Sequence, residues 1–423
     1  MRLGILAALV VASSTALFAG AAQAQQACPV RLGGILPLTG SLASIGKGIA
    51  DAAQMTVDQI NQAGGVKGCP IEFILRDDQT QTPVAMDAAK FLIEVQRVPA
   101  IIGPVPSAAA VPVLTSIAAP AKVVLATCCA TTPTLTTLAQ EGKSGGYFFR
   151  TLPTTKTQAY SLARIAIEAG YRKTAVVWAN NDNGRFTFSD FQKAYEKMGG
   201  KVVSDASFNE NQPSYRAEVQ KALAGSPDSV LFIAFPQDGA TVTREWLSLG
   251  GSQNILVING LRSEEYIKAV GPRFLQKMIG YDVAQVRGPS VDAFNTAWND
   301  KFGRAPATPG LHSTYDAVMT VALAMTMAKE INGTEIRDNM RKVLDPAGEV
   351  VFPGVDGFKK AVELIKAGKA IRYVGATGPL EYDQYGDVSA PTMQWKIDAD
   401  GKIVEGGQRT LDEVRALFKQ IDG

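Results

Sequence analysis

Histidine and cysteine are both scarce in this sequence, with one histidine and four cysteines among 423 residues. A single histidine, His312, cannot supply a histidine-based metal site and leaves little material for a Ser-His-Asp triad. We interpret His312 as a packing or capping residue at the start of an apolar helix. The sequence therefore predicts a protein that is not an enzyme and binds no metal or cofactor.

The chain also lacks an excess of charge of one sign and long apolar runs. Lys and Arg number 42 against 40 Asp and Glu, which gives a formal net charge of +2. Such a balance provides no electrostatic footprint for nucleic acid. After residue 24, no stretch approaches the roughly 18 consecutive apolar residues of a membrane span. The remaining chain is longer than one hydrophobic core usually supports, so we expect two domains.

The N-terminus has the pattern of a secretory signal peptide. Arg2 precedes an apolar run over residues 3–11, and small residues follow as far as Ala22-Gln23-Ala24. We predict a signal peptide over residues 1–24, cleaved after Ala24, and therefore a periplasmic protein. The alternatives are a membrane anchor, for which the run is short, and lipoprotein processing at Cys28, which Gln25-Gln26-Ala27 suits poorly.

Short apolar runs alternate with helical patterns from residue 28 onward, which is typical of parallel sheets covered by helices. Strands are expected first at 30–37, 71–75, 100–102 and 123–125. After a pause at 147–153, more are expected at 174–178, 202–206, 229–233, 255–259 and 278–281. The last third is mostly helical, with helices expected at 290–302, 310–329, 333–344, 357–367 and 411–421 and a strand at 392–397. The sequence thus predicts an α/β fold of two Rossmann-like lobes with parallel-type sheets.

Several turns after the predicted strands of the first lobe carry glycine or hydroxyl side chains. Residues 40–48 superficially resemble a phosphate loop, but the glycine spacing is wrong and Gly48 stands where Ser or Thr must hold the metal. Ser107 opens a helix after the third strand, and a polar run over 126–133 follows the fourth. Ligands bind at this carboxyl edge of open α/β sheets. Ser107 fits an anion site as well as an ordinary helix cap, and both interpretations stay open.

A set of short motifs, in this order along the chain, resembles the type I periplasmic solute-binding proteins of the leucine/isoleucine/valine-binding family. The motifs are Leu36-Pro37-Leu38-Thr39-Gly40 with Gly46, Asn61-Gln62-Ala63-Gly64-Gly65-Val66-Lys67-Gly68, Asp77-Asp78-Gln79, Ile101-Ile102-Gly103-Pro104, Asn183-Gly184-Arg185, Ser313-Thr314-Tyr315-Asp316-Ala317 and Gly378-Pro379-Leu380-Glu381-Tyr382-Asp383 with Gly386-Asp387. Each motif alone is weak, but the ordered set is specific and covers nearly all of the chain after residue 24.

The resemblance implies a substrate-binding protein of an ABC importer of the branched-chain amino acid class. Its two lobes would be joined by a three-crossing hinge and would close on a small-molecule solute, with the importer's permease and ATPase subunits as partners. We expect lobe one to comprise residues 25–150 and 283–376, lobe two to comprise 151–282 and 377–423, and the protein to be a monomer. A ligand sensor on the same fold, not coupled to transport, is the alternative.

The resemblance also implies a ligand site, with some departures from the family pattern. Ser107, Cys129 and Thr131 match the positions that bind the carboxylate and ammonium of an amino acid. Three further positions depart from the aliphatic amino-acid binders because they are not tyrosine; they are Ile45, Asn183 and Phe235.

The acidic partner of a ligand ammonium should fall near Leu261, where the sequence reads Asn259-Gly260-Leu261-Arg262 without a carboxylate. A buried ammonium without a carboxylate costs several kcal/mol. We therefore expect a polar or carboxylate-bearing solute that need not be an amino acid, such as an aromatic acid packed on Ile45 and Phe235. Arg262 either supplies a positive charge to the site or is a solvated rim residue. Glu264 or Glu265 could still reach the pocket.

Export makes disulfides permissible, so the four cysteines need an account. Cys28 and Cys69 each precede a strand, and if these strands are parallel neighbours, the two cysteines lie close enough to bridge. Cys128 and Cys129 are adjacent and lie in the predicted binding loop. They form either a strained disulfide between neighbours in the chain or two small packed thiols.

Overall fold

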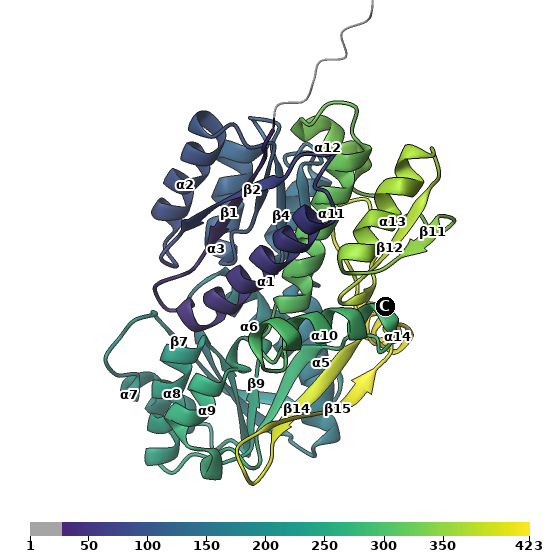
Figure 1. The fold of residues 1–423 in the computed structure, drawn as a ribbon. Coiled ribbons are helices and arrows are strands. Elements are labelled where there is room, and N and C mark those ends of the chain that lie inside the picture. The colour runs from purple at the N-terminus through teal and green to yellow at the C-terminus, as the bar shows by residue number, and fades with distance from the viewer. Residues whose placement is uncertain (1–27) are drawn as a thin grey trace, which may run out of the picture.

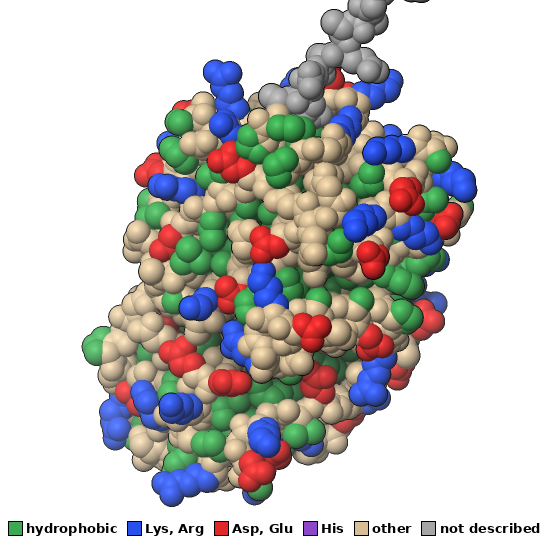
Figure 2. Space-filling model, viewed as in Figure 1, with side chains coloured by type: hydrophobic (Ala, Val, Ile, Leu, Met, Phe, Trp, Pro, Cys, Tyr) green, Lys and Arg blue, Asp and Glu red, His purple; other side chains and the backbone are tan. Residues whose placement is uncertain are grey.

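Two β-sheets, one in each of two stacked lobes, organise the chain in this computed structural model, which describes residues 28–423 (Figure 1). The predicted signal peptide and its cleavage site lie outside the described residues. The predicted α/β fold with two lobes is confirmed. No helix within residues 28–423 is both long and apolar enough to cross a membrane. Basic and acidic side chains are intermingled on the face drawn in Figure 2.

The sheet of the first lobe is entirely parallel, with its strands in the order β2-β1-β3-β4-β5. Its strands are β1 (Val30–Leu36), β2 (Ile71–Asp77), β3 (Ala100–Ile102), β4 (Val124–Thr127) and β5 (Phe148–Arg150). The first four match predicted strands. The fifth was missed because it lies in the segment 147–153, where the alternation of strands and helices was expected to pause.

The sheet of the second lobe is mixed, with its strands in the order β15-β14-β10-β9-β8-β6-β7. The parallel part, as predicted, consists of β6 (Lys173–Ala179), β7 (Lys201–Phe208), β8 (Ser229–Ile233), β9 (Ile255–Val257) and β10 (Ile279–Val283). The antiparallel part is a hairpin from the tail, β14 (Thr392–Ile397) and β15 (Ile403–Arg409). A short turn can join only antiparallel strands, so the hairpin gives this sheet its mixed character.

Helices cover both sheets, as the alternating pattern predicted (Figure 1). Those of the first half are α1 (Ala43–Gln62), α2 (Thr82–Lys90), η1 (Phe91–Val95), α3 (Ser107–Val113), η2 (Leu114–Ala118) and α4 (Pro133–Gln140). The second lobe has α5 (Thr155–Glu168), α6 (Asp182–Lys197), α7 (Arg216–Leu223), α8 (Pro236–Ser248), η3 (Asn259–Leu261), α9 (Glu264–Val270), η4 (Pro272–Phe274) and α14 (Leu411–Asp422). The strand expected at 255–259 therefore ends at Val257, and a 3₁₀ turn takes over at Asn259.

After β10 the chain returns to the first lobe and adds its innermost helix. This segment comprises α10 (Pro289–Phe302), α11 (Leu311–Met327), α12 (Gly333–Asn339) and α13 (Val355–Lys366), with a small sheet of β11 (Glu349–Val351), β12 (Ile371–Gly375) and β13 (Gly378–Pro379). Helix α11 is mostly apolar and is buried along nearly its whole length, which is typical of a core helix. It packs against α1 and lies in the same hydrophobic core as β1, β3 and β4.

The chain passes between the lobes three times, after β5, after β10 and between β13 and β14. Arg150, fully buried at the first crossing, donates from Nε to Asp387 Oδ1 of the third crossing at 2.6 Å. Tyr382 and Val388 of the third crossing pack into the core of the first lobe. The residue boundaries given above for the two lobes stay a prediction.

Candidate functional site

The carboxyl ends of strands from both sheets supply the residues of the candidate site. In the first lobe, α1 begins after β1, α3 begins at Ser107 after β3, and the loop over residues 128–132 follows β4. In the second lobe, α6 follows β6, α8 follows β8, η3 follows β9, and Asp282 lies at the end of β10. This is the edge where open α/β sheets bind ligands, and here two such edges contribute to one cleft.

An apolar cluster joins the two lobes at this cleft. Its buried members all come from the first lobe; they are Leu36, Leu42, Ile45, Ile49, Val105 and Cys128. Cys129 and Phe235 are partly buried against this cluster, and Phe235 precedes α8 of the second lobe. The structure therefore brings together Ile45, Cys129 and Phe235, three of the residues predicted to line the ligand site.

Hydroxyl and amide groups lie beside this apolar cluster. Ser107 is 7% exposed, and its Oγ accepts a hydrogen bond from the backbone N–H of Thr132 at 3.3 Å. Asn183 Nδ2 donates to Thr131 Oγ1 at 3.1 Å, which links the second lobe to the first. The described conformation is thus one in which the two lobes touch across the site.

Arg150 and Thr127 hold the loop over residues 128–132 in place. Arg150 Nη1 donates to the carbonyl oxygens of Ala130 at 3.1 Å and Thr132 at 2.9 Å. Thr127 Oγ1 accepts from the backbone N–H of Cys129 at 3.3 Å and of Ala130 at 3.1 Å. The sequence analysis missed Arg150, although an arginine at the end of the apolar run Tyr147-Phe148-Phe149 was a signal that could have indicated a buried cation.

The two cysteine pairs differ in the structure. Cys28 and Cys69 form a disulfide next to the neighbouring parallel strands β1 and β2, which confirms the predicted bridge. Cys128 and Cys129 are not bonded to each other in this structure, with sulfur atoms 2.7 Å apart, and the disulfide between them stays a prediction beside the two packed thiols. Burial raises the pKa of the Cys129 thiol, and the Cys128 thiol raises it further. A thiol that resists ionisation is a poor partner for disulfide exchange, because the thiolate is the reacting form.

Arg262 is buried, which corrects its interpretation as a solvated rim residue. Only 6% of it is exposed. Its Nη1 donates to Asp282 Oδ2 at 2.8 Å, and its Nη2 forms an ion pair with Glu405 on β15. Burial lowers the pKa of the guanidinium, but the two carboxylates outweigh this effect and raise the pKa overall. The positive charge predicted for this position is present, and carboxylates of the same lobe already neutralise it.

Asp282 is the buried carboxylate that the sequence analysis did not find. Its side chain is 7% exposed at the end of β10. Burial raises the pKa of Asp282, although the charge of Arg262 works in the opposite direction. Its charge also acts on Cys129 in the opposite lobe, where it raises the thiol pKa. The rule that located Ser107, a polar residue at the end of a predicted strand, applies equally to Tyr281-Asp282 and could have found this residue.

Leu261 and His312 are the remaining residues singled out in the sequence. Leu261 is fully buried in the core of the second lobe, so the structure does not bring it into contact with the cleft cluster. His312 is buried against Phe294, with its Nε2 2.9 Å from Asn295 Oδ1, which confirms its interpretation as a packing residue. Burial lowers the pKa of His312 to about 3, and the charge of Arg262 adds to this effect.

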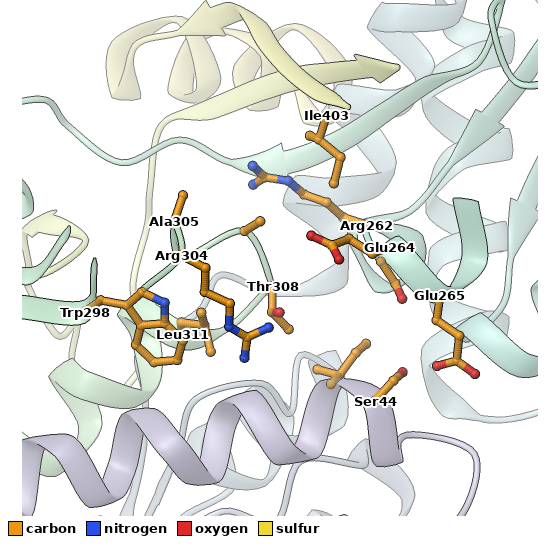
Figure 3. A pocket seen from close by; sticks show the side chains of 13 residues that line it. Ser44, Arg262, Glu264, Glu265, Trp298, Arg304, Ala305, Thr308, Leu311 and Ile403 are labelled. Atoms are coloured by element: carbon orange, nitrogen blue, oxygen red, sulfur yellow. The ribbon is translucent and has the colours of Figure 1, made fainter. Parts of the chain in front are cut away.

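A cavity of about 130 Å³ borders the site between the two lobes (Figure 3). Its volume is slightly below the roughly 150 Å³ of a cavity that accepts benzene. Ile45 and Arg262, both predicted site residues, are among its lining residues, as are the exposed Glu264 and Glu265 at its edge. Within the described residues, no group of three or more His, Cys, Asp or Glu is placed to hold a metal ion.

Comparisons with known proteins point to one family. The family model described as "Periplasmic binding protein" matches residues 29–372. "Leu/Ile/Val-binding protein homolog 3" of Brucella melitensis is 26% identical over 407 residues, covering 96% of this chain and 99% of that protein. "Chemotactic signal transduction system substrate-binding protein BasB" of Halobacterium salinarum is 24% identical over 357 residues, covering 84% and 83%.

A solved structure has the same fold. It is the solute-binding protein of an ABC transporter from R. palustris in complex with benzoate, which superposes with a TM-score of 0.73. The two proteins are 18% identical, and the match covers 90% of this chain and 96% of the other. At this level of identity the similarity shows the fold alone.

Proposed function

This chain belongs to the periplasmic binding protein family, and from that membership we propose that it is the substrate-binding protein of an ABC importer of the branched-chain amino acid class. It captures a small carboxylate-bearing solute, an amino acid or an aromatic acid, by closure of its two lobes. The permease and ATPase subunits of the importer are its partners. The protein acts as a periplasmic monomer after cleavage behind Ala24, and it catalyses no reaction.

The observation that carries this proposal is the contact of two strand-end edges across one cleft. Thr131 from the first lobe and Asn183 from the second are hydrogen-bonded there. A ligand held by groups from both lobes favours closure, because it binds the closed form better than the open form. An importer can then distinguish loaded from empty protein by the shape of the closed form.

In the proposed site, polar groups of the first lobe bind the head group of the solute. Ser107 Oγ and Thr131 Oγ1 can each donate a hydrogen bond to a carboxylate, and the backbone around Cys129 adds N–H groups. Ile45 and Phe235 pack on the apolar body, and Asn183 and Arg262 reach the solute from the second lobe. Leu261 acts through the packing of the second lobe.

The names of similar proteins support two solute classes. One relative is a Leu/Ile/Val-binding protein homolog, and one structural neighbour holds benzoate. Both solutes combine a carboxylate with an apolar body, as the proposed site requires. The cavity of about 130 Å³ beside the site is close in volume to the roughly 150 Å³ of a cavity that accepts benzene.

A ligand screen tests this proposal. The purified protein, refolded to remove co-purified ligand, is heated with amino acids, benzoates, amides or urea, and hits are measured by calorimetry. A ligand of the proposed class raises the melting temperature by mass action. Ser107→Ala should weaken binding about tenfold or more, since a hydrogen bond to a charged group contributes roughly 1.5–3 kcal/mol. Ser248→Ala, at an exposed position on α8, is the matched control. Binding of no carboxylate, or equal affinity in both variants, would contradict the proposal.

A sensor is the second candidate, because one relative is described as part of a chemotactic signal transduction system. Uptake of the radiolabelled ligand by cells with and without the gene separates the two roles. Loss of uptake on deletion supports the importer, whereas intact uptake with a lost behavioural or transcriptional response supports the sensor.

A further inference from the structure

A buried ion pair lies on the second-lobe side of the cleft and contains a carboxylate, the group that a buried ligand ammonium would need as a partner. Arg262 Nη1 and Asp282 Oδ2 are 2.8 Å apart, and the two side chains are 6% and 7% exposed. Arg262 also pairs with Glu405, whose side chain is 43% exposed. All three residues belong to the second lobe, so the pair involves no group of the first lobe.

Asp282 is the only deeply buried carboxylate among the described site residues, and its charge is already paired with Arg262. His312, which faces Arg262 from the first lobe, is neutral because burial lowers its pKa to about 3. The Cys129 thiol, which faces Asp282, also stays neutral because burial raises its pKa. Glu264, Glu265 and Arg304 line the cavity but are exposed, so water and salt weaken their effect on a buried ligand. The buried part of the site is therefore close to neutral.

We infer that Arg262 takes the place of the ligand ammonium in this protein, so that the solute is a small carboxylic acid without an ammonium group. Arg262 neutralises Asp282 internally, so the described site residues leave no buried carboxylate of the second lobe free for an ammonium. This inference rests on the proposed function and narrows its solute class. It makes Arg262 and Asp282 the residues that decide selectivity.

Pairs of acids that differ only in the ammonium group test this inference in the intact mature protein. Leucine is compared with 4-methylpentanoate, and phenylalanine with 3-phenylpropanoate, by calorimetry. The acid without the ammonium is expected to bind at least tenfold tighter in each pair for which binding is measurable. Equal or tighter binding of the amino acids would overturn the inference and leave the proposed function standing. Absence of binding by all four acids and by benzoate would overturn both.

Variants of the ion pair provide a second readout. Arg262→Leu leaves Asp282 without a partner, so the preference should shift toward the amino acids by at least tenfold. Combining it with Asp282→Asn removes the free carboxylate and should abolish that shift, while Arg262→Lys keeps a cation and should retain the wild-type preference. Arg216→Leu, at an exposed position on α7, is the matched control. An unchanged preference in Arg262→Leu, with the fold intact by circular dichroism, would overturn the inference.

Discussion

Replacing Arg150 by methionine should both destabilise the protein and loosen the loop over residues 128–132. The Arg150 side chain is fully buried and pairs with Asp387, whose side chain is 10% exposed. Methionine fills a similar volume but leaves the Asp387 charge buried without a cation. Removing one partner of a buried ion pair costs about 3–5 kcal/mol in unfolding free energy. We expect Arg150→Met to fall in this range.

The same substitution removes donors from the loop that carries Cys129 and Thr131. Arg150 donates to the carbonyl oxygens of Ala130 and Thr132 and to Thr136 Oγ1. Arg150→Lys keeps a positive charge near Asp387 but lacks the planar fork that reaches these acceptors at once. Lysine should therefore recover part of the stability while ligand affinity remains reduced.

Urea denaturation followed by circular dichroism measures the stability change, and calorimetry with the best ligand measures affinity. Arg409→Met is the matched control, because it breaks a pair with Glu168 in which both side chains are more than 30% exposed. Exposed pairs contribute about 0–1 kcal/mol. If Arg150→Met costs no more than Arg409→Met, the reasoning from burial is wrong. If Arg150→Lys binds ligand like the wild type, Arg150 does not position the loop.

Three further predictions concern stability. Replacing Cys28 and Cys69 by serine should lower the unfolding free energy by about 4 kcal/mol, from the chain-entropy model for a separation of 41 residues; a loss under 1 kcal/mol in urea denaturation would refute this. Burial raises the pKa of Asp78 from 3.8 to about 6, so its contribution to the unfolding free energy is fully present below pH 3.8 and is lost as pH rises through 6. The melting temperature of Asp78→Asn relative to the wild type should therefore rise over that window, whereas that of Asp300→Asn, at an exposed position, should not. Burial lowers the pKa of His312 from 6.5 to about 3, so its contribution to the unfolding free energy is present above pH 6.5 and is lost as pH falls toward 3. His312→Gln should flatten the decline of melting temperature with falling pH. An unchanged slope of melting temperature against pH would refute the lowered pKa of His312.

The elements that the sequence predicted well are those with a local hydrophobic period. The strand at Ser229–Ile233 and the helix at Pro289–Phe302 agree with prediction to within one residue. β5 ends in an arginine and β11 is mostly exposed, so neither has the purely apolar sequence that revealed the equally short β3 and β9. β15 reads Ile-Val-Glu-Gly-Gly-Gln-Arg and lies mostly exposed at a sheet edge, so its hydrogen-bonded partner β14 defines it rather than its own composition.

By itself, the sequence determined the two α/β lobes, the strand-end edges that carry Ser107 and Thr131, and the Cys28–Cys69 bridge. Hydrophobic alternation is a property of neighbouring residues, and the ends of parallel strands must meet at one edge, so the lobes and the strand-end edges follow without coordinates, whereas the bridge also needed β1 and β2 to be neighbours. Tertiary structure alone decided the charge balance of the cleft. Arg262 meets Asp282 and Glu405, which lie 20 and 143 residues away in the chain. Whether a buried charge is free for a ligand depends on which distant residue folds against it, and no local pattern encodes that contact.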